Sequence, residues 1–281
     1  MAANPSGRVV LLTGAAGGLG RAMTAALLQD GHAIAAADRD HDGLERLLAS
    51  HDAAAAEGRL YAIRADLSEL QACHDAVSLA VSHFGRLEAL INNAGIGMSS
   101  IRPDAETRHP GIAEVTPDLW DSFFAINVRA PMLLTRAALP HMQAAGFGRI
   151  VNNTTSYVTM LRVLPYGATK AAFESMSAVW AKELDGSGIT VNVLVPGGPT
   201  DTPFVSDGAG WPREKMLKPA IMGPPIRWLI SDASSGTNGR RITAARFDPG
   251  LAPADAAEKA SRPIGWPELA ADAVWLQAPS P

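Results

Sequence analysis

Short aliphatic runs alternate with longer helical patterns along most of this chain. The aliphatic runs cover residues 8–14, 32–38, 59–66, 87–95, 148–154 and 188–197, with a final run near Arg241 to Arg246. The helical patterns cover residues 18–31, about 40–50, a segment ending near His83, a stretch from Pro117 to about Ala145, and the helix that carries Lys170. Apolar strands joined by helices are typical of a parallel sheet with helices on each side. The alternation therefore predicts an α/β fold with a doubly wound parallel sheet.

The length of 281 residues suits one such domain, and the 47% hydrophobic residues are enough to fill its core. We expect a single Rossmann-type domain over residues 1–250 and a C-terminal extension over residues 251–281. Trp266 and Trp275 stand in this extension among prolines and alanines. Because tryptophan is poorly suited to solvent, we expect the extension to pack on the domain or on a neighbouring subunit.

Charge and cysteine content exclude several classes of protein. The net charge of −4 gives no electrostatic reason to expect a nucleic acid or an anionic membrane as partner. Cys73 is the only cysteine, so no disulfide can form within the chain, and a reducing cytoplasm is the expected location. The first residues enter a strand-like run without the pattern of a signal peptide, and no apolar run reaches membrane-spanning length. We predict no metal site.

A glycine cluster, "TGAAGGLG", places Gly14, Gly18 and Gly20 between the first strand and the first helix. A side chain there would keep the backbone away from a pyrophosphate, which binds the N-H groups at a helix N-terminus. Asp38 ends the second strand, and its carboxylate can accept hydrogen bonds from both ribose hydroxyls and repel a 2'-phosphate. This favours NAD as cofactor. The neighbouring Arg39 keeps NADP open as the less favoured alternative.

Tyr166 is the only one of three tyrosines with a lysine four residues later, Lys170. On a helix these two residues lie on one face, and a nearby ammonium lowers the pKa of a phenol toward working pH. The phenol would then serve as a general acid or base. A tyrosine on a buried helix face beside a lysine with a purely structural role remains the alternative.

Taken together, these residues resemble the short-chain dehydrogenase/reductase family over roughly residues 8–250. The resemblance rests on "TGAAGGLG", Asp66 after the third strand, "NNAG" at 92–95, Asn127, "YGATK", and "PGGPTDT" at 196–202. It implies an NAD(P)-dependent oxidoreductase that interconverts a secondary alcohol and a ketone on a small or medium-sized substrate. The nicotinamide would supply the hydride, and the protein would align the reactants and transfer the proton.

The resemblance also implies a role for each motif residue. Tyr166 would exchange a proton with the substrate oxygen, Lys170 would bind the nicotinamide ribose and tune Tyr166, and Asn127 would support a water-mediated proton relay. Motif and resemblance together imply a cofactor site made of Gly14, Gly18, Leu19, Gly20, Asp38, Arg39, Asp66, Leu67, Asn93, Ala94, Gly95, Tyr166, Lys170, Pro196, Gly197 and Thr202.

The family places a substrate-positioning serine after the strand that precedes the tyrosine, and this chain departs from that pattern. Counting forward from Ile150 selects Thr155, whereas residue type selects Ser156, and the segment before Tyr166 is slightly shorter than is usual. Neighbouring residues of a strand point to opposite faces, so the two hydroxyls are not equivalent. We predict Thr155 first and Ser156 second. The missing serine also motivates an alternative function, a non-catalytic nucleotide-binding regulatory or scaffold protein on the same fold.

Two long irregular segments, residues 96–116 and 198–224, interrupt the alternation, and either surface decoration or a border of the substrate site explains them. Assembly is the last expectation. The resemblance implies a homo-oligomer, a tetramer or a dimer, that pairs the helices near Pro117 to Ala145 and Pro165 to Asp185. An apolar stripe on the second helix, Phe173, Met176, Val179 and Trp180, supports this interface or else faces the core.

Overall fold

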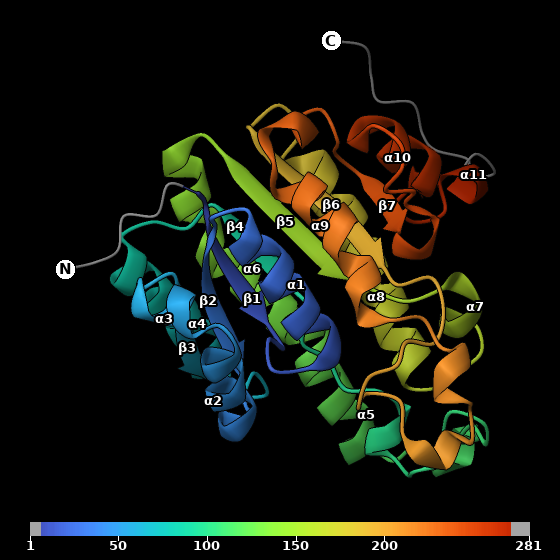
Figure 1. Ribbon diagram of the computed structural model, residues 1–281. Helices are drawn as coiled ribbons and strands as arrows, with labels where there is room; N and C mark the ends of the chain where they lie inside the picture. The colour runs from blue at the N-terminus through green and yellow to red at the C-terminus, as the bar shows by residue number, and fades with distance from the viewer. Residues whose placement is uncertain (1–6, 271–281) are drawn as a thin grey trace.

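The strand segments of the chain join in one eight-stranded sheet in the computed structural model, which describes residues 7–270 (Figure 1). The strands are β1 (Val9–Thr13), β2 (Ala33–Asp38), β3 (Leu60–Arg64), β4 (Ala89–Asn92), β5 (Gly148–Asn153), β6 (Ile189–Val195), β7 (Arg240–Thr243) and β8 (Ser261–Pro263). Their order is β3-β2-β1-β4-β5-β6-β7-β8, and all neighbouring pairs are parallel except β7 and β8. The predicted doubly wound α/β fold is confirmed.

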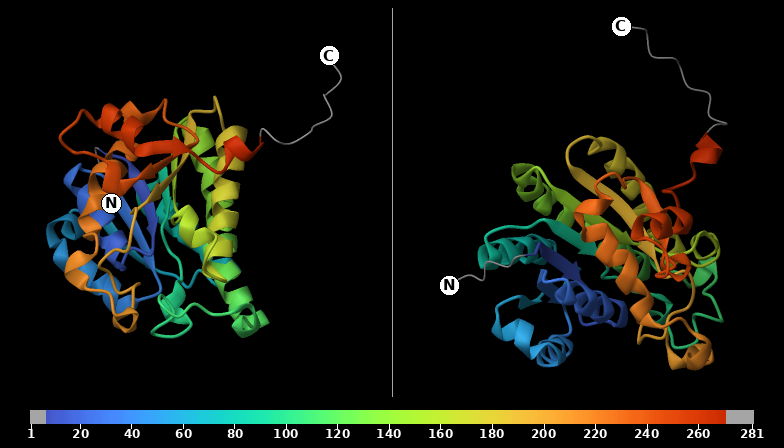
Figure 2. Two further views of the ribbon diagram at one scale, coloured as in Figure 1. Left: turned by 90° about the vertical axis from the view of Figure 1, so that its right-hand side faces the viewer. Right: turned by 45° about the horizontal axis from the view of Figure 1, so that its top comes forward.

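Helices cover both faces of the sheet, as the left view of Figure 2 shows. They are α1 (Gly18–Gln29), α2 (His41–Ser50), α3 (Asp52–Ala56), α4 (Leu70–Phe84), α5 (Pro117–Phe124), α6 (Ala130–Ala145), α7 (Tyr157–Met160), α8 (Tyr166–Glu183), α9 (Gly223–Ile230), α10 (Pro253–Ala260) and α11 (Pro267–Ala270). In β1, Val10 and Leu12 pack with α1, α2 and α9, whereas Val9 and Leu11 pack with α4, α6 and α8. The central strands β1, β4, β5 and β6 are thus buried on both faces, which explains their continuous apolar runs.

The long helical stretch predicted from Pro117 to Ala145 is not one regular helix. A π-helical turn, η3 (Ala125–Arg129), separates α5 from α6 and contains the buried Asn127. Such turns widen the backbone locally and are frequent at functional sites. Here the turn lies beside the carboxyl end of the sheet, where it brings the Asn127 side chain within hydrogen-bond distance of Ile96.

The C-terminal part of the fold continues past the strand predicted near Arg241 to Arg246. That strand is β7, followed by a 3₁₀ turn over Ala244–Arg246, and β8 then pairs antiparallel with β7. α10 packs in the same core as α1 and α9 through three buried alanines, Ala256, Ala257 and Ala260. Trp266 packs against Tyr157, with ring centroids 5.6 Å apart. Trp275 lies outside the described residues, and the boundary at residue 250 stays a prediction.

The two irregular segments meet at the carboxyl ends of the parallel strands, at the lower right of Figure 1. The Ser99 hydroxyl donates to the Phe204 carbonyl at 2.9 Å, and a Cβ at Gly97 would lie 2.3 Å from the Phe204 ring. Because the two segments contact each other, they form one wall over the carboxyl ends of the strands. Ligands bind at these strand ends in sheets of this kind.

Candidate active site

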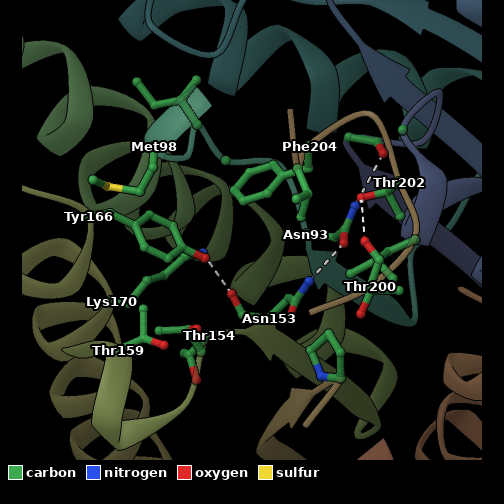
Figure 3. A pocket seen from close by; sticks show the side chains of 18 of the residues that line it. Asn93, Met98, Asn153, Thr154, Thr159, Tyr166, Lys170, Thr200, Thr202 and Phe204 are labelled. Carbon is green, nitrogen blue, oxygen red and sulfur yellow. Dashed lines mark hydrogen bonds between the residues drawn. The ribbon is translucent and has the colours of Figure 1, made fainter. Parts of the chain in front are cut away.

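A cleft of about 990 Å³ lies at the carboxyl ends of the strands, between the first turn of α1 and the two irregular segments (Figure 3). Every site residue predicted from the sequence lines this cleft except Asn127. Those that line it are Gly14, Gly18, Leu19, Gly20, Asp38, Arg39, Asp66, Leu67, Asn93, Ala94, Gly95, Thr155, Ser156, Tyr166, Lys170, Pro196, Gly197 and Thr202. Residues that are far apart in the sequence thus share one cavity, while their individual roles stay predictions.

The glycines between β1 and α1 are required by the protein's own packing. Gly14 has a positive φ of 66°, and a Cβ there would lie 2.8 Å from the Ala94 backbone. A Cβ at Gly20 would lie 2.1 Å from the Gly14 carbonyl oxygen. No side chain caps α1, and the first N-H groups of a helix have no acceptor within the helix. These groups line the cleft, so they are available to an anionic group such as a pyrophosphate.

Two carboxylates stand where β2 and β3 end. Asp38 accepts the Ala16 N-H at 2.9 Å through one oxygen and the Asp40 N-H at 3.0 Å through the other. Asp66 accepts both the backbone N-H and the hydroxyl of Ser68, and these hydrogen bonds, the backbone one first, hold the pKa of Asp66 below its ordinary value. Each carboxylate is therefore held in a fixed orientation and keeps free lone pairs for hydroxyl groups of a ligand.

A chain of hydrogen bonds between asparagine side chains crosses the strand ends, and the sequence motifs predicted only part of it. The Asn93 amide donates to the Thr13 and Gly14 carbonyls, at 2.9 and 3.1 Å, and the Asn153 amide donates to Asn93 Oδ1 at 3.0 Å (Figure 3). Lys170 Nζ donates to the Asn153 carbonyl at 2.8 Å. These hydrogen bonds connect the glycine turn after β1 to the reacting end of the cleft. Asn153 was not predicted as a site residue, although an Asn-Asn pair stands at the carboxyl end of both β4 and β5.

Asn127 lies behind the cleft and does not line it. Its Oδ1 accepts the Ile96 N-H at 2.9 Å, and its Nδ2 donates to the Ile96 carbonyl at 3.0 Å and to the Thr169 hydroxyl at 3.1 Å. A Cβ at Gly95 would lie 3.0 Å from Asn127 Oδ1 and 3.5 Å from Lys170 Nζ. Asn127 therefore fixes the loop after β4 next to Lys170, and its part in a proton relay stays a prediction.

Tyr166 and Lys170 lie together at the reacting end, on the first two turns of α8. Burial raises the pKa of Tyr166 to about 12, and a hydrogen bond with the Thr155 side chain opposes this rise. Burial also lowers the pKa of Lys170 to about 8. The prediction that Lys170 lowers the pKa of Tyr166 is wrong for this state of the protein. The ammonium donates to the Asn153 carbonyl and lies 5.8 Å from the centre of the phenol ring, and desolvation is the largest cause of the shift in the pKa of Tyr166.

The two candidate hydroxyls have different surroundings. Thr155 interacts with Tyr166, whereas the Ser156 hydroxyl caps α7, since it accepts the Thr159 N-H at 3.1 Å and lies 2.8 Å from the Thr159 hydroxyl. Ser156 is also exposed. Thr155 is therefore the better candidate for the serine position, because it lines the cleft with Tyr166 and its side chain acts on the pKa of the phenol.

Apolar side chains form the rest of the reacting end. The ring of Phe204 lies 5.9 Å from that of Tyr166, between their centroids, and Met98 packs nearby (Figure 3). The remaining apolar residues of this part include Val163, Val205 and Trp211. None of these was predicted individually, because they lie in irregular segments without a repeating pattern. Arg162, Glu106 and His109 add charged or polar groups to the lining.

Residues 7–270 contain no group of three or more His, Cys, Asp or Glu side chains placed to hold a metal ion. Over the same part of the chain, no helix has both the length and the hydropathy needed to span a bilayer.

Comparison with known proteins agrees with this geometry. The family model described as short chain dehydrogenase matches residues 8–211. A 3-oxoacyl-[acyl-carrier-protein] reductase of Thermotoga maritima is 30% identical, over 84% of this chain and 95% of its own length. A 2-(R)-hydroxypropyl-CoM dehydrogenase of Xanthobacter autotrophicus is 33% identical, over 84% and 96%.

Two solved structures are also similar. A 3-ketoacyl-(acyl-carrier-protein) reductase from Brucella melitensis, complexed with NADH, has a TM-score of 0.68 and 29% identity, covering 83% of this chain and 94% of its own. A short chain dehydrogenase from Burkholderia cenocepacia, in complex with NADP, has a TM-score of 0.71 and 27% identity, covering 84% and 95%. One of these neighbours holds NADH and the other NADP, so the comparison leaves the choice of cofactor open.

Proposed function

The chain belongs to the short chain dehydrogenase family of oxidoreductases, and on that premise we propose that it transfers a hydride between NAD and a secondary alcohol or ketone. The observation that carries the proposal is the shared cleft. Tyr166, Lys170 and Thr155 line the same cavity as the first turn of α1 and the Asp38 carboxylate. A proton-transfer group and a nucleotide cradle in one cavity are the two parts that this reaction needs.

In this proposal the protein moves the proton and the cofactor, when bound, supplies or accepts the hydride. Tyr166 donates its proton to the carbonyl oxygen in reduction and accepts it from the hydroxyl in oxidation. Thr155 holds that same oxygen, since its hydroxyl both donates and accepts. Lys170 holds the ribose next to the nicotinamide, and the carbonyl of Asn153 orients its ammonium.

The residues present fit a dinucleotide, and we favour NAD over NADP. The N-H groups at the start of α1 suit the pyrophosphate, and Asp38 suits the ribose hydroxyls, because backbone N-H groups already hold both of its oxygens in place. A 2'-phosphate would meet the negative charge of Asp38 at close range. Arg39 also lines the cleft and is exposed, and it is the residue that would favour NADP.

The substrate we propose is a small or medium-sized alcohol or ketone with an apolar body. Met98, Val163 and Phe204 surround the reacting end, so carbon groups beside the reacting carbon are favoured there. The hydroxyl groups of Thr155 and Tyr166 at the reacting end would hydrogen-bond a single substrate oxygen.

A panel of secondary alcohols and ketones, followed by the absorbance of the reduced nicotinamide, tests the proposed function. We expect turnover with NAD or NADH for at least one member, at a higher kcat/KM than with NADP or NADPH. If the cofactor bound tightly and no member turned over, the alternative of a nucleotide-binding scaffold protein would gain support. The presence of Thr155, Tyr166 and Lys170 together in the cleft argues against a scaffold, because binding alone does not require a proton-transfer group there.

We also propose a homo-oligomer, a tetramer or a dimer, formed through α6 and α8. The predicted stripe on α8 is divided: Phe173 is buried in the protein's own fold, whereas Val179 is 57% exposed. Met132 on α6 is 37% exposed, so both helices offer apolar side chains to a partner. Light scattering at micromolar concentration should give a multiple of 29.4 kDa, and the mass of one chain would refute the proposal.

A further inference from the structure

A buried ion pair lies directly behind Thr155, and none of the site motifs includes it. Arg241 from β7 donates through Nη1 to Glu174 Oε2 of α8 at 2.6 Å. The residues are 6% and 0% exposed. Charges are rarely buried so completely, and a buried pair is weak evidence for stability, because its desolvation offsets its attraction. A gain in stability alone therefore does not explain the pair.

The pair holds the chain between β5 and α7. Arg241 Nη1 donates to the Thr154 hydroxyl at 3.0 Å, and Nη2 donates to the Thr155 carbonyl. The Thr154 hydroxyl donates in turn to Glu174 Oε2 at 2.7 Å. The pairing of β5 with β6 ends at Asn153, so Thr155 lies beyond the ladder. The planar guanidinium thus provides, at a fixed angle, the hydrogen bonds that a neighbouring strand would otherwise supply.

The C-terminal segment closes this network from the other side. The Tyr157 hydroxyl lies 2.8 Å from the Gly265 carbonyl, to which it donates, and 3.2 Å from Glu174 Oε1. The guanidinium of Arg241 lies over the Tyr157 ring, 4.3 Å from its centroid. The Gly265 N-H reaches Glu174 Oε1 at 3.4 Å. Both oxygens of Glu174 therefore have partners, so the carboxylate and the guanidinium are each fixed in one orientation.

We propose that Arg241 and Glu174 are positioning residues that hold the Thr155 backbone so that its hydroxyl stays on Tyr166. The inference rests on the proposed function, since it assigns a support to the proton-transfer site. Thr155 is the link: its carbonyl is held by Arg241, and its side chain lines the cleft together with Tyr166, where its hydrogen bond opposes the rise in the pKa of the phenol. A pair with a purely structural role would stabilise the fold without affecting this contact.

Nuclear magnetic resonance tests the link without any need for turnover. The chain has three tyrosines, so ¹³Cζ-labelled tyrosine gives three signals, and the chemical shift of Tyr166 at neutral pH responds to the hydrogen bond on its oxygen. We expect Thr155→Val and Arg241→Met to move the Tyr166 signal in the same direction by a similar amount. An Arg241→Met spectrum in which Tyr166 stays at its wild-type position, while Thr155→Val moves it, would overturn the proposal.

A matched control comes from the other end of the sheet. Arg149 is 1% exposed and donates to the Ser235 hydroxyl at 2.7 Å, at the amino end of β5. Arg149→Met removes an equally buried arginine far from the phenol, so its Tyr166 signal should match wild type. Arg241→Met leaves Glu174 charged without its partner. The double variant Arg241→Met with Glu174→Gln removes both charges, and we expect the same displacement of the Tyr166 signal from this protein.

Kinetics then show whether Arg241 acts through Thr155. With a substrate in hand, Arg241→Met should lower kcat by about tenfold and change cofactor affinity by less than about threefold. In the Thr155→Val background the same substitution should cost less than about threefold, because residues that act as a unit are not additive. Independent, multiplying losses would overturn the proposal. Absence of turnover in the wild type would count against the proposed function alone, since the spectra still decide whether the pair fixes Thr155.

Discussion

The two ends of the cleft are built differently. At the nucleotide end, three candidate groups lie at or directly after the end of a strand: Gly14 after β1, Asp38 as the last residue of β2, and Asp66 after β3. At the reacting end, the groups depend on contacts between distant segments, as Arg241 and Thr155 are 86 residues apart. The positions of the groups at the nucleotide end thus follow from the sheet, because each lies where a strand ends. The groups at the reacting end need further side chains, from distant segments, to hold them in place.

The largest loss of activity should come from a substitution at the reacting end. Tyr166→Phe removes the proton donor and leaves the ring in place, so we expect kcat to fall by about 10²–10⁴-fold. Affinity for NADH should stay nearly unchanged, because the cradle at the start of α1 does not involve the hydroxyl. Tyr61→Phe is the control, since Tyr61 stacks on His83 away from the cleft. A near-normal rate in Tyr166→Phe would remove Tyr166 from the proton transfer.

The next effect concerns pH, and its sign follows from the pKa of Tyr166. Burial raises this pKa to about 12, so the phenol is protonated at neutral pH. Oxidation needs the phenolate, whose fraction rises about tenfold per pH unit below the pKa. We expect the initial rate of alcohol oxidation to rise by up to about 100-fold from pH 7 to pH 9, at saturating substrate.

Ketone reduction uses the protonated phenol, which is present throughout this range, and should vary much less. The residual activity of Tyr166→Phe should lack the rise. An oxidation rate that stays flat from pH 7 to pH 9 in the wild type would show that loss of the Tyr166 proton does not limit the reaction.

At the nucleotide end, Asp38→Asn should produce an effect of about tenfold in the ratio of the NAD and NADP dissociation constants, in favour of NADP. Asparagine keeps one side-chain oxygen for the Ala16 or Asp40 N-H group but loses the negative charge that opposes a 2'-phosphate. Arg39→Ala is the counterpart and should weaken NADP without weakening NAD. Titration of both cofactors into each protein measures the ratio. A wild type that already prefers NADP would assign the choice to Arg39.

The same contrast between the two ends explains how much the sequence predicts. The alternation of strands and helices, the glycine turn and the Tyr166–Lys170 pair all follow from local patterns, because each depends on residues close together in the chain. The network of Glu174 and Arg241 does not, since its partners are 67 residues apart and neither belongs to a motif. The direction in which the pKa of Tyr166 shifts depends on burial, which the spacing of Tyr166 and Lys170 in the sequence does not reveal. β8 escapes prediction because its three residues carry too little pattern.

The smallest effect should come from Ser156, and it distinguishes the two hydroxyls that the sequence leaves unresolved. Ser156 caps α7 and is exposed, so Ser156→Ala should cost about 0.5–1 kcal/mol of stability. It should change kcat by less than about threefold, because the Ser156 hydroxyl is occupied by the Thr159 N-H, whereas the side chain of Thr155 acts on the pKa of Tyr166. Thermal unfolding and steady-state rates of Ser156→Ala and Thr155→Val, measured side by side, give the comparison. If Ser156→Ala lost more turnover than Thr155→Val, Ser156 would take the serine position, and the role inferred for Arg241 would lose its target.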